Sequence, residues 1–140
     1  MLGIKRMDHV CMAVWKLDER LPMLTKLFGM KEASRFDNPQ AGYNGVTLDV
    51  PGSDTQWELL EPCDDDGFLA RFLNERGPGL HHVTFQVESV EQATQALKEF
   101  GYEPFGGRSY GRYKEVYLHP RDTGGVLFQL YEGDWSDGNG

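Results

Sequence analysis

Two short stretches decide the fold. Residues 8–10 read Asp-His-Val and residues 81–83 read His-His-Val, and the matching histidines lie 82 − 9 = 73 positions apart. Each triplet belongs to a run, 7–14 or 80–87, in which side chains alternate between two faces. Alternation with a period of two is typical of a β-strand that is buried on one face. The sequence therefore predicts the same first strand twice.

Two further landmarks recur at nearly the same spacing. The pair Phe-Gly at 28–29 recurs at 100–101, an offset of 72, and closes a predicted helix in each half. The run Trp-Glu-Leu-Leu-Glu at 57–61 resembles Phe-Gln-Leu-Tyr-Glu at 128–132, an offset of 71. Three landmarks that drift by one residue each predict one βαβββ module written twice along the chain.

The repeat predicts an α+β fold. We expect a single domain, 1–140, whose two modules span approximately 4–62 and 79–133. A linker with a short helix joins the modules, and residues 134–140 form a polar tail. Packing the modules about a pseudo-two-fold axis would curve their sheets into an open mixed β-barrel around a metal site, with the helices outside.

Composition excludes several classes of function. The chain carries 14 Lys and Arg against 22 Asp and Glu, so its formal net charge is 14 − 22 = −8. An acidic chain lacks the positive charge that binding to nucleic-acid phosphates requires. The longest apolar run, Val10–Trp15, is too short to span a membrane, and no signal peptide is visible. Two cysteines, Cys11 and Cys63, do not make a disulfide framework, so we predict a cytoplasmic protein with reduced thiols.

Four polar residues occupy repeat-related positions on the predicted strands. His9 and His82 lie on the first strand of each half, and Glu58 and Gln129 lie on the last. The period of two places all four on the sheet face that we expect to be free of helices. Two imidazoles, one carboxylate and one amide oxygen suit a divalent ion of intermediate softness: Mn, Fe, Co, Ni or Zn. We therefore predict one such ion per chain, with two octahedral positions open to water or substrate.

Basic residues gather in and beside a glycine-rich segment, 105–111. Arg108, Arg112 and Lys114 form the densest local cluster of positive charge, and they could attract an anionic small-molecule substrate. We expect the glycine-rich segment to be a flexible cover over the barrel, because it lacks the strand and helix context of a phosphate-binding loop. His81 points away from the face of its neighbour in the ligand set and is predicted to be structural.

Longer motifs resemble those of a known family. They are Met-Asp-His-Val at 7–10, Leu-Phe-Gly-Met at 27–30, Glu-Leu-Leu-Glu-Pro at 58–62, Phe-Leu-Asn-Glu-Arg-Gly at 72–77, Gly-Leu-His-His at 79–82 and His-Pro-Arg-Asp-Thr-Gly-Gly-Val-Leu at 119–127. The chain resembles the vicinal oxygen chelate (glyoxalase/bleomycin resistance/dioxygenase) superfamily, and within it the methylmalonyl-CoA epimerases. The resemblance implies paired modules around a metal held by His9, Glu58, His82 and Gln129, and it implies a homodimer.

The chain departs from the epimerase pattern at its carboxylates. That pattern has Gln at the position of Glu58 and Glu at the position of Gln129, so the amide and the carboxylate are exchanged between the halves. The epimerases also have a proton-transferring Glu on the third strand of the first module. Leu48 is the best match to that Glu here, and Asp49 lies one residue off and faces the other way. The resemblance therefore implies the fold and the metal site but not the epimerase reaction, because both carboxylates of a two-base epimerisation are missing or displaced.

The ligand set predicts a class of reaction. We expect a metal-dependent lyase or isomerase, epimerase-like or glyoxalase-like, that stabilises an enolate-type intermediate of a small carbonyl or acyl-thioester substrate. Glu58 is the candidate base, because substrate can displace a metal-bound carboxylate. Two alternatives stay open. His9, His82 and Glu58 match the ligand set of Fe(II)-dependent dioxygenases, and resistance proteins of the superfamily bind their ligands without metal.

Overall fold

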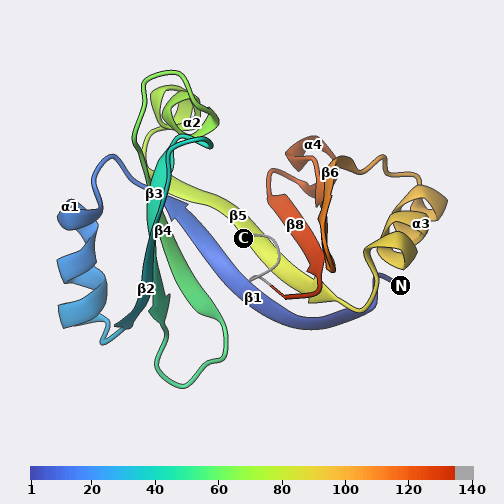
Figure 1. Cartoon of the computed structure of the whole chain (residues 1–140), viewed down its shortest axis with the longest axis horizontal. Coiled ribbons are helices and arrows are strands. Elements are labelled where there is room, and N and C mark those ends of the chain that lie inside the picture. The colour runs from blue at the N-terminus through green and yellow to red at the C-terminus, as the bar shows by residue number, and fades with distance from the viewer. Residues whose placement is uncertain (135–140) are drawn as a thin grey trace. The chain divides into compact units, whose positions relative to one another are not determined.

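The computed structural model describes residues 1–134, and it has an α+β fold. Its strands are β1 (Ile4–Ala13), β2 (Lys31–Asn38), β3 (Tyr43–Asp49), β4 (Gln56–Pro62), β5 (Gly79–Val87), β6 (Phe105–Tyr110), β7 (Tyr113–Leu118) and β8 (Leu127–Glu132). Its helices are α1 (Leu17–Pro22), the π-helical η1 (Met23–Leu27), α2 (Phe68–Arg76), α3 (Val90–Phe100) and α4 (Pro120–Thr123) (Figure 1). Of the predicted tail, 134–140, all but Asp134 lies outside the described residues.

The chain divides into two compact units. The N-terminal unit is His9–His81, and the C-terminal unit combines Met1–Asp8 with the described residues from His82 onward. The strand order is β2-β3-β4-β1 in the first half of the sheet and β5-β8-β7-β6 in the second. Each half has one parallel pair, β1 with β4 or β5 with β8, beside antiparallel neighbours. The mixed, open sheet and its repeated βαβββ order confirm the predicted fold class, while the single domain stays a prediction.

The repeat is visible in how the two helices begin. The backbone N–H of Leu17, at the start of α1, donates to Oε2 of Glu61 at 3.2 Å. The N–H of Val90, at the start of α3, donates in the same way to Oε1 of Glu132 at 2.9 Å. The first N–H groups of a helix have no partner within it, and here a glutamate on the last strand of the same half accepts one of them. Glu61 near the end of β4 and Glu132 at the end of β8 therefore have the same role in the two halves.

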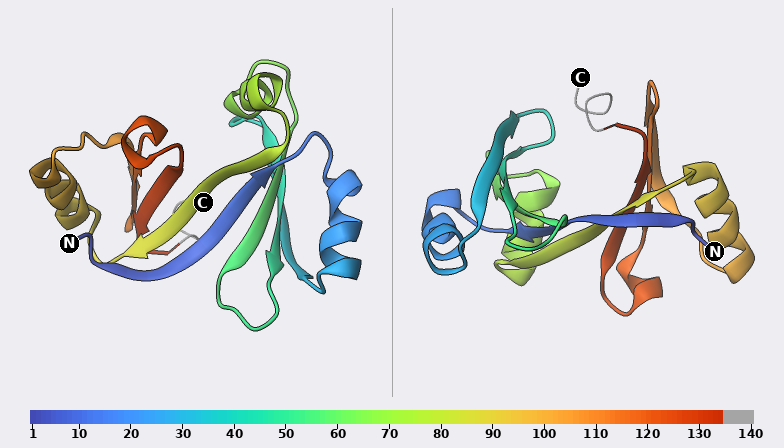
Figure 2. Two further views of the ribbon diagram at one scale, coloured as in Figure 1. Left: turned by 180° about the vertical axis from the view of Figure 1, so that it is seen from behind. Right: turned by 90° about the horizontal axis from the view of Figure 1, so that it is seen from below.

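One face of each half of the sheet packs against an amphipathic helix. In the N-terminal unit, Val46, Leu48 and Leu59 are fully buried against α1 and η1. In the C-terminal unit, α3 packs in the same way over Val116 and Leu130 (Figure 2). Because side chains alternate along a strand, the residues between these apolar ones point to the opposite face.

That opposite face in the N-terminal unit is not free of helices, contrary to the prediction. Side chains of α2 join an apolar cluster on it, which contains Cys11, Ala13, Leu60, Leu69 and Leu73. His9 points to the same face as Cys11, since they are two residues apart on β1. The linker helix must bury its own apolar stripe, and α1 already covers the other face of the sheet. Helix α2 therefore covers one end of the face that carries His9.

One local prediction was also wrong. The glycine-rich segment predicted as a flexible cover contains the strand β6, which pairs with β7 and has an irregular register between Phe105 and Arg108. Gly106 has a φ of +67° there, a conformation that a glycine adopts without strain. The helix predicted to close at the Phe-Gly pair of 28–29 is present, and it changes to a π-helix after Pro22, which cannot donate the hydrogen bond that would continue the α-helical pattern.

Candidate metal centre

Two of the predicted ligands lie together in the N-terminal unit. β1 and β4 run parallel with Cys11 opposite Glu58, so His9 and Glu58 project from the same face of neighbouring strands. Nε2 of His9 and Oε1 of Glu58 are 3.6 Å apart, and both side chains are largely buried. A metal ion about 2.1 Å from each donor atom can join atoms up to about 4.2 Å apart. The pair therefore fits two neighbouring positions around one divalent ion.

The other two predicted ligands lie on neighbouring strands of the C-terminal unit. Gln129 on β8 is opposite Thr84 on β5, and His82 is two residues before Thr84 on the same face. Gln129 is only 6% exposed, and its Oε1 accepts a hydrogen bond from the Thr84 hydroxyl at 2.7 Å. Its Nε2 donates to the hydroxyl of Tyr117 at 3.2 Å. These bonds fix the amide orientation and leave the second lone pair of Oε1 to bind an ion.

Within each unit, one histidine and one carboxylate or amide project from the same face of two neighbouring strands. Within the N-terminal unit the structure brings His9 and Glu58 together. Within the C-terminal unit it places His82 and Gln129 on adjacent strands. The donor chemistry of both pairs suits a divalent ion, and the ligand set of all four stays a prediction.

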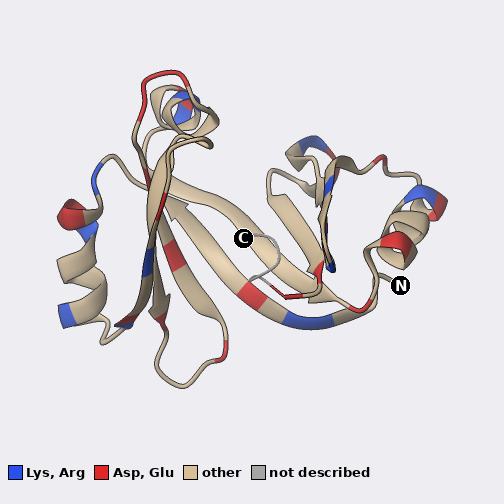
Figure 3. Ribbon diagram, in the orientation of Figure 1, with Lys and Arg blue, Asp and Glu red and all other residues tan. Residues whose placement is uncertain are grey.

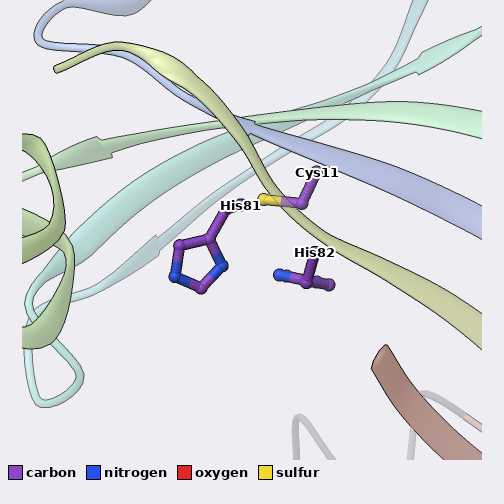
Figure 4. Close-up of side chains that lie close together, drawn as sticks. All are labelled: Cys11, His81 and His82. Atoms are coloured by element: carbon purple, nitrogen blue, oxygen red, sulfur yellow. The ribbon is translucent and has the colours of Figure 1, made fainter. Parts of the chain in front are cut away.

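A thiol and a further histidine lie beside the N-terminal pair, and sequence reasoning gave them no role at the site. Sγ of Cys11 and a ring nitrogen of His81 lie within 4.8 Å of each other (Figure 4). Burial raises the pKa of the Cys11 thiol well above its ordinary value, and the nearby Glu58 carboxylate raises it further. The thiol is therefore protonated near neutral pH, and a protonated thiol is a poor metal ligand.

His81 packs among aromatic side chains. Its ring centroid is 5.5 Å from that of Phe68 and 4.8 Å from that of Phe72, both on α2. Burial lowers the pKa of His81 to about 4, and the positive charge of Arg76 contributes to the shift. A neutral imidazole held among rings fits the structural role predicted for His81.

The position expected for a family-type base differs from the prediction. Leu48 is fully buried against α1, so it lies on the face opposite to Glu58. Residues 45, 47 and 49 of β3 instead share the face of Glu58, because Thr47 is directly opposite it. Asp49 is therefore on the same face as Glu58. The sequence interpretation, which matched Leu48 to the family's base, had placed Asp49 on the other face. It is exposed, and its Oδ1 accepts a hydrogen bond from Gln56 at 2.9 Å.

Sequence reasoning missed a buried carboxylate in the C-terminal unit. Glu115 on β7 is only 4% exposed, and its Oε1 accepts a hydrogen bond from the Tyr113 hydroxyl at 2.8 Å. Nη2 of Arg108 lies 3.5 Å from Oε2 of Glu115. The available signal was the alternation along β7. Residues 113, 115 and 117 are polar or aromatic and share one face, whereas the apolar Val116 and Leu118 lie on the other.

The predicted basic cluster lies along β6 and β7 and the turn between them (Figure 3). Arg108 and Lys114 line a hollow of about 470 Å³ together with Lys98 of α3. Desolvation lowers the pKa of Arg108, but the carboxylate of Glu115 outweighs it, and the net shift is upward. The guanidinium therefore carries its charge at every physiological pH, as an anion-binding role requires.

Comparison with known proteins reveals relatives over most of the chain. Residues 8–116 match the glyoxalase/bleomycin resistance protein/dioxygenase superfamily. The chain belongs to this superfamily. An ethylmalonyl-CoA/methylmalonyl-CoA epimerase of Cereibacter sphaeroides is 31% identical over 134 residues, which are 91% of this chain and 97% of that protein. The mitochondrial methylmalonyl-CoA epimerase of Homo sapiens is 28% identical over 133 residues, covering 91% of this chain and 74% of that protein.

Solved structures of the superfamily agree with these relatives. The crystal structure of methylmalonyl-CoA epimerase from Mycobacterium tuberculosis superposes with a TM-score of 0.82 at 30% identity. The match covers 94% of this chain and 90% of that one. The predicted superfamily and its fold are thereby confirmed. The epimerase relatives indicate that this chain is an isomerase of the superfamily. No helix in residues 1–134 combines the length and hydropathy needed to cross a membrane.

Proposed function

We propose that this protein is an epimerase of 2-carboxyacyl-CoA thioesters of the methylmalonyl-CoA type. The observation that carries the proposal is the juxtaposition of His9 and Glu58, in a chain whose relatives over nearly its full length are epimerases of such thioesters. The substrate carries a carboxylate and CoA phosphates, so the basic residues of β6 and β7 favour its approach. This proposal refines the predicted class of lyase or isomerase to an isomerase.

The four predicted ligands would hold the divalent ion. His9 and Glu58 would bind it from the N-terminal unit, and His82 and Gln129 from the C-terminal unit. A bound ion of this kind supplies Lewis-acid polarisation of carbonyl oxygens. In the C-terminal unit, Thr84 and Tyr117 hold the Gln129 amide with its oxygen turned away from the tyrosine, so that residue is oriented before an ion arrives.

The protein groups would carry the proton. Glu58 takes the proton from the α-carbon, and the C–H electron pair moves toward the thioester carbonyl to give an enolate. Return of a proton to the opposite face of that carbon completes the inversion, with no net change in atoms or electrons. Epimerisation therefore needs a second acid on the other face of the substrate.

Wild-type protein loaded with Mn, Co, Ni or Zn should epimerise methylmalonyl-CoA and exchange its α-proton with solvent. NMR in heavy water measures the deuterium at the α-carbon, and chromatography measures the ratio of the two epimers. A sample treated with chelator provides the control. If no metal form incorporates deuterium or changes the epimer ratio, the proposed function is wrong.

Metal binding should depend on His82 and should stabilise the fold. We expect about one divalent ion per chain in wild type, and His82→Ala should lose most of it. His81→Phe is a matched control, because the neighbouring ring packs among aromatic side chains.

At a hundredfold excess over Kd, the ion adds roughly 2.7 kcal/mol to the free energy of unfolding, which is about 5–10 °C in Tm. Equal metal content in wild type and His82→Ala would contradict the ligand assignment, and an unchanged Tm after verified metal removal would contradict the stabilisation.

Oxygen consumption separates the dioxygenase alternative from the epimerase. An Fe(II)-loaded dioxygenase consumes oxygen with substrate, whereas proton transfer at an α-carbon consumes none. A metal-free resistance protein would bind its ligand equally well before and after chelation. The homodimer and the cytoplasmic location stay predictions.

A further inference from the structure

The amide of Gln129 can present either of two groups to an ion. A glutamine side chain ends in an oxygen, which binds cations, and in an NH2 group, which has no lone pair to offer them. A half-turn of the amide exchanges the two groups with little change of shape. A glutamine ligand therefore needs neighbours that distinguish its oxygen from its nitrogen, whereas a carboxylate, with two equivalent oxygens, does not.

The neighbours of this amide are hydroxyl groups. Nε2 of Gln129 is 3.2 Å from the hydroxyl of Tyr117 and 3.4 Å from that of Tyr113. Oε1 of Gln129 is 2.7 Å from the hydroxyl of Thr84. A hydroxyl can donate or accept, so these three side chains could also satisfy an amide turned the other way. A further group must fix the direction in which a hydroxyl proton points.

Glu115 fixes that direction for Tyr113. Oε1 of Glu115 accepts a hydrogen bond from the Tyr113 hydroxyl at 2.8 Å. A carboxylate oxygen only accepts, and a phenol has one proton to donate. The Tyr113 oxygen therefore acts as an acceptor toward Gln129, which agrees with the bond from Nε2. The carboxylate thereby selects the amide orientation in which Oε1 faces Thr84 and keeps a lone pair for an ion.

Glu115 is itself held in place at some cost in stability. Only 4% of its surface is exposed, and Nη2 of Arg108 lies 3.5 Å from its second oxygen, Oε2. Oε2 is buried and has no hydrogen-bond partner within the described part of the chain. A buried carboxylate oxygen without a hydrogen bond destabilises a protein, so its presence calls for an explanation. Control of the Tyr113 proton by the other oxygen provides one.

The two hairpins allow a comparison within the chain. The cross-strand register gives two equivalent pairs, each a predicted ligand on the last strand of a half and its partner on the strand before: Glu58 with Thr47, and Gln129 with Tyr117. Two residues before these partners, positions 45 and 115 therefore correspond, and each faces the same way as the ligand of its own half. The half with the carboxylate ligand has a glycine there, and the half with the amide ligand has a glutamate.

Packing in the N-terminal unit excludes a side chain at the glycine. A Cβ built on Gly45 would overlap the ring of Phe36 and would lie 2.7 Å from Cδ2 of Leu60. Such approaches are far shorter than ordinary van der Waals contacts. An orienting carboxylate is therefore present in the half whose ligand is an amide, and it is excluded from the half whose ligand needs no orientation.

We propose that Glu115 is a positioning residue that turns the oxygen of Gln129 toward the metal ion by directing the Tyr113 proton. This inference rests on the ligand role of Gln129 in the proposed function. Without an acceptor at position 115, the Tyr113 hydroxyl can donate to Gln129 instead, and the amide can turn its NH2 group toward the ion. Glu115 acts on the ion only through the other two residues.

Removing the acceptor should weaken metal binding. Glu115→Met keeps an unbranched side chain and has no carboxylate, so its Kd for Co²⁺ should rise by about 10- to 100-fold, the usual cost of losing a group that orients a ligand. Titration followed by the visible absorption of bound Co²⁺ measures the Kd. Glu99→Met is a matched control, because it is the same substitution on the exposed surface of α3 in the same unit, and it should bind Co²⁺ as wild type does.

A change of ligand separates orientation from charge and packing. Gln129→Glu gives the ion a carboxylate with two equivalent oxygens, so the direction of the Tyr113 proton no longer matters. In the Gln129→Glu background, Glu115→Met should therefore leave Co²⁺ binding no weaker. If Glu115 contributed only its charge or its packing, Glu115→Met would weaken binding equally in both backgrounds, and that result would overturn the proposal.

NMR of the metal-free wild type tests the orientation without any variant. Nuclear Overhauser effects should connect the side-chain amide protons of Gln129 to the ring protons of Tyr113 and Tyr117 that lie next to their hydroxyls. Contacts of these amide protons with Thr84 in place of the two rings would overturn the proposal, even if Glu115→Met does not fold. If wild type binds no Co²⁺, the ligand set of the proposed function and this inference fall together, whereas wild-type affinity in Glu115→Met rejects the inference alone.

Discussion

Replacing Glu58 with glutamine should lower the epimerisation rate by about 10²- to 10⁴-fold, or about 3–5 kcal/mol of transition-state stabilisation. The carboxylate is the proposed proton carrier on the N-terminal side, and an amide cannot take the α-proton. The amide oxygen can still bind an ion, so metal content should stay close to that of wild type. Rates with methylmalonyl-CoA and elemental analysis on the same samples check both expectations.

Glu61→Gln is a matched control on the same strand. Glu61 points to the opposite face of β4, where its carboxylate accepts the N–H of Leu17, and a glutamine oxygen can accept the same bond. The activity of Glu61→Gln should be that of wild type.

The reciprocal change, Gln129→Glu, adds negative charge to the metal site, which should weaken the Lewis acidity of the ion without supplying a base. Wild-type activity in Glu58→Gln would remove Glu58 from the mechanism.

The free energy of unfolding of the metal-free protein should fall by about 3 kcal/mol through His81 as the pH is lowered from about 6.5 to about 4. Unfolded His81 binds a proton below its ordinary pKa of about 6.5, whereas the folded pKa is about 4. Between these values the unfolded state holds more protons, so stability rises with pH. The contribution is fully present above pH 6.5 and is lost as the pH falls toward 4.

Urea unfolding at a series of pH values, in chelator, measures this dependence. His81→Phe should remain packed against Phe68 and Phe72, and it has no imidazole to protonate. The difference between the wild-type and variant curves isolates His81 from the other titrating groups. Parallel curves between pH 4 and 6.5 would show that burial of a neutral His81 contributes nothing.

The order and type of the elements could be read from the sequence because those signals are local. A period of two or of 3.6, a Phe-Gly helix end and a recurrence near 73 residues are all properties of a continuous segment. Helix α2 is the short helix predicted for the linker, and α3 ends at Phe100, as the Phe-Gly pair predicts. The same local rule correctly placed His9 and Glu58 on one face, since parallel neighbours in register share their facing.

Tertiary structure alone decided what covers that face and what lies beside the ligands. Alternation predicts which side chains of a strand point together, but it does not say which helix packs on them. The sequence therefore does not reveal that α2 covers the sheet face of His9, where it packs with Cys11 and Leu60. The glycine-rich sequence predicts a flexible cover and not the strand β6, because pairing with β7 depends on a partner strand that no local propensity reveals.

Glu115 shows most clearly where sequence reasoning ends. A lone glutamate in a strand is usually solvated, and the alternation along β7 shows only that Glu115 faces the same way as Tyr113 and Tyr117, without showing that it is buried. Its environment is set by Arg108 on β6 and Tyr113 on β7, and its counterpart in the other half is identified only by cross-strand register. The sequence by itself determined two βαβββ modules and four candidate ligands. Only the folded sheet, by pairing β7 with β8 and placing Arg108 and Tyr113 beside Glu115, decided that this glutamate is buried.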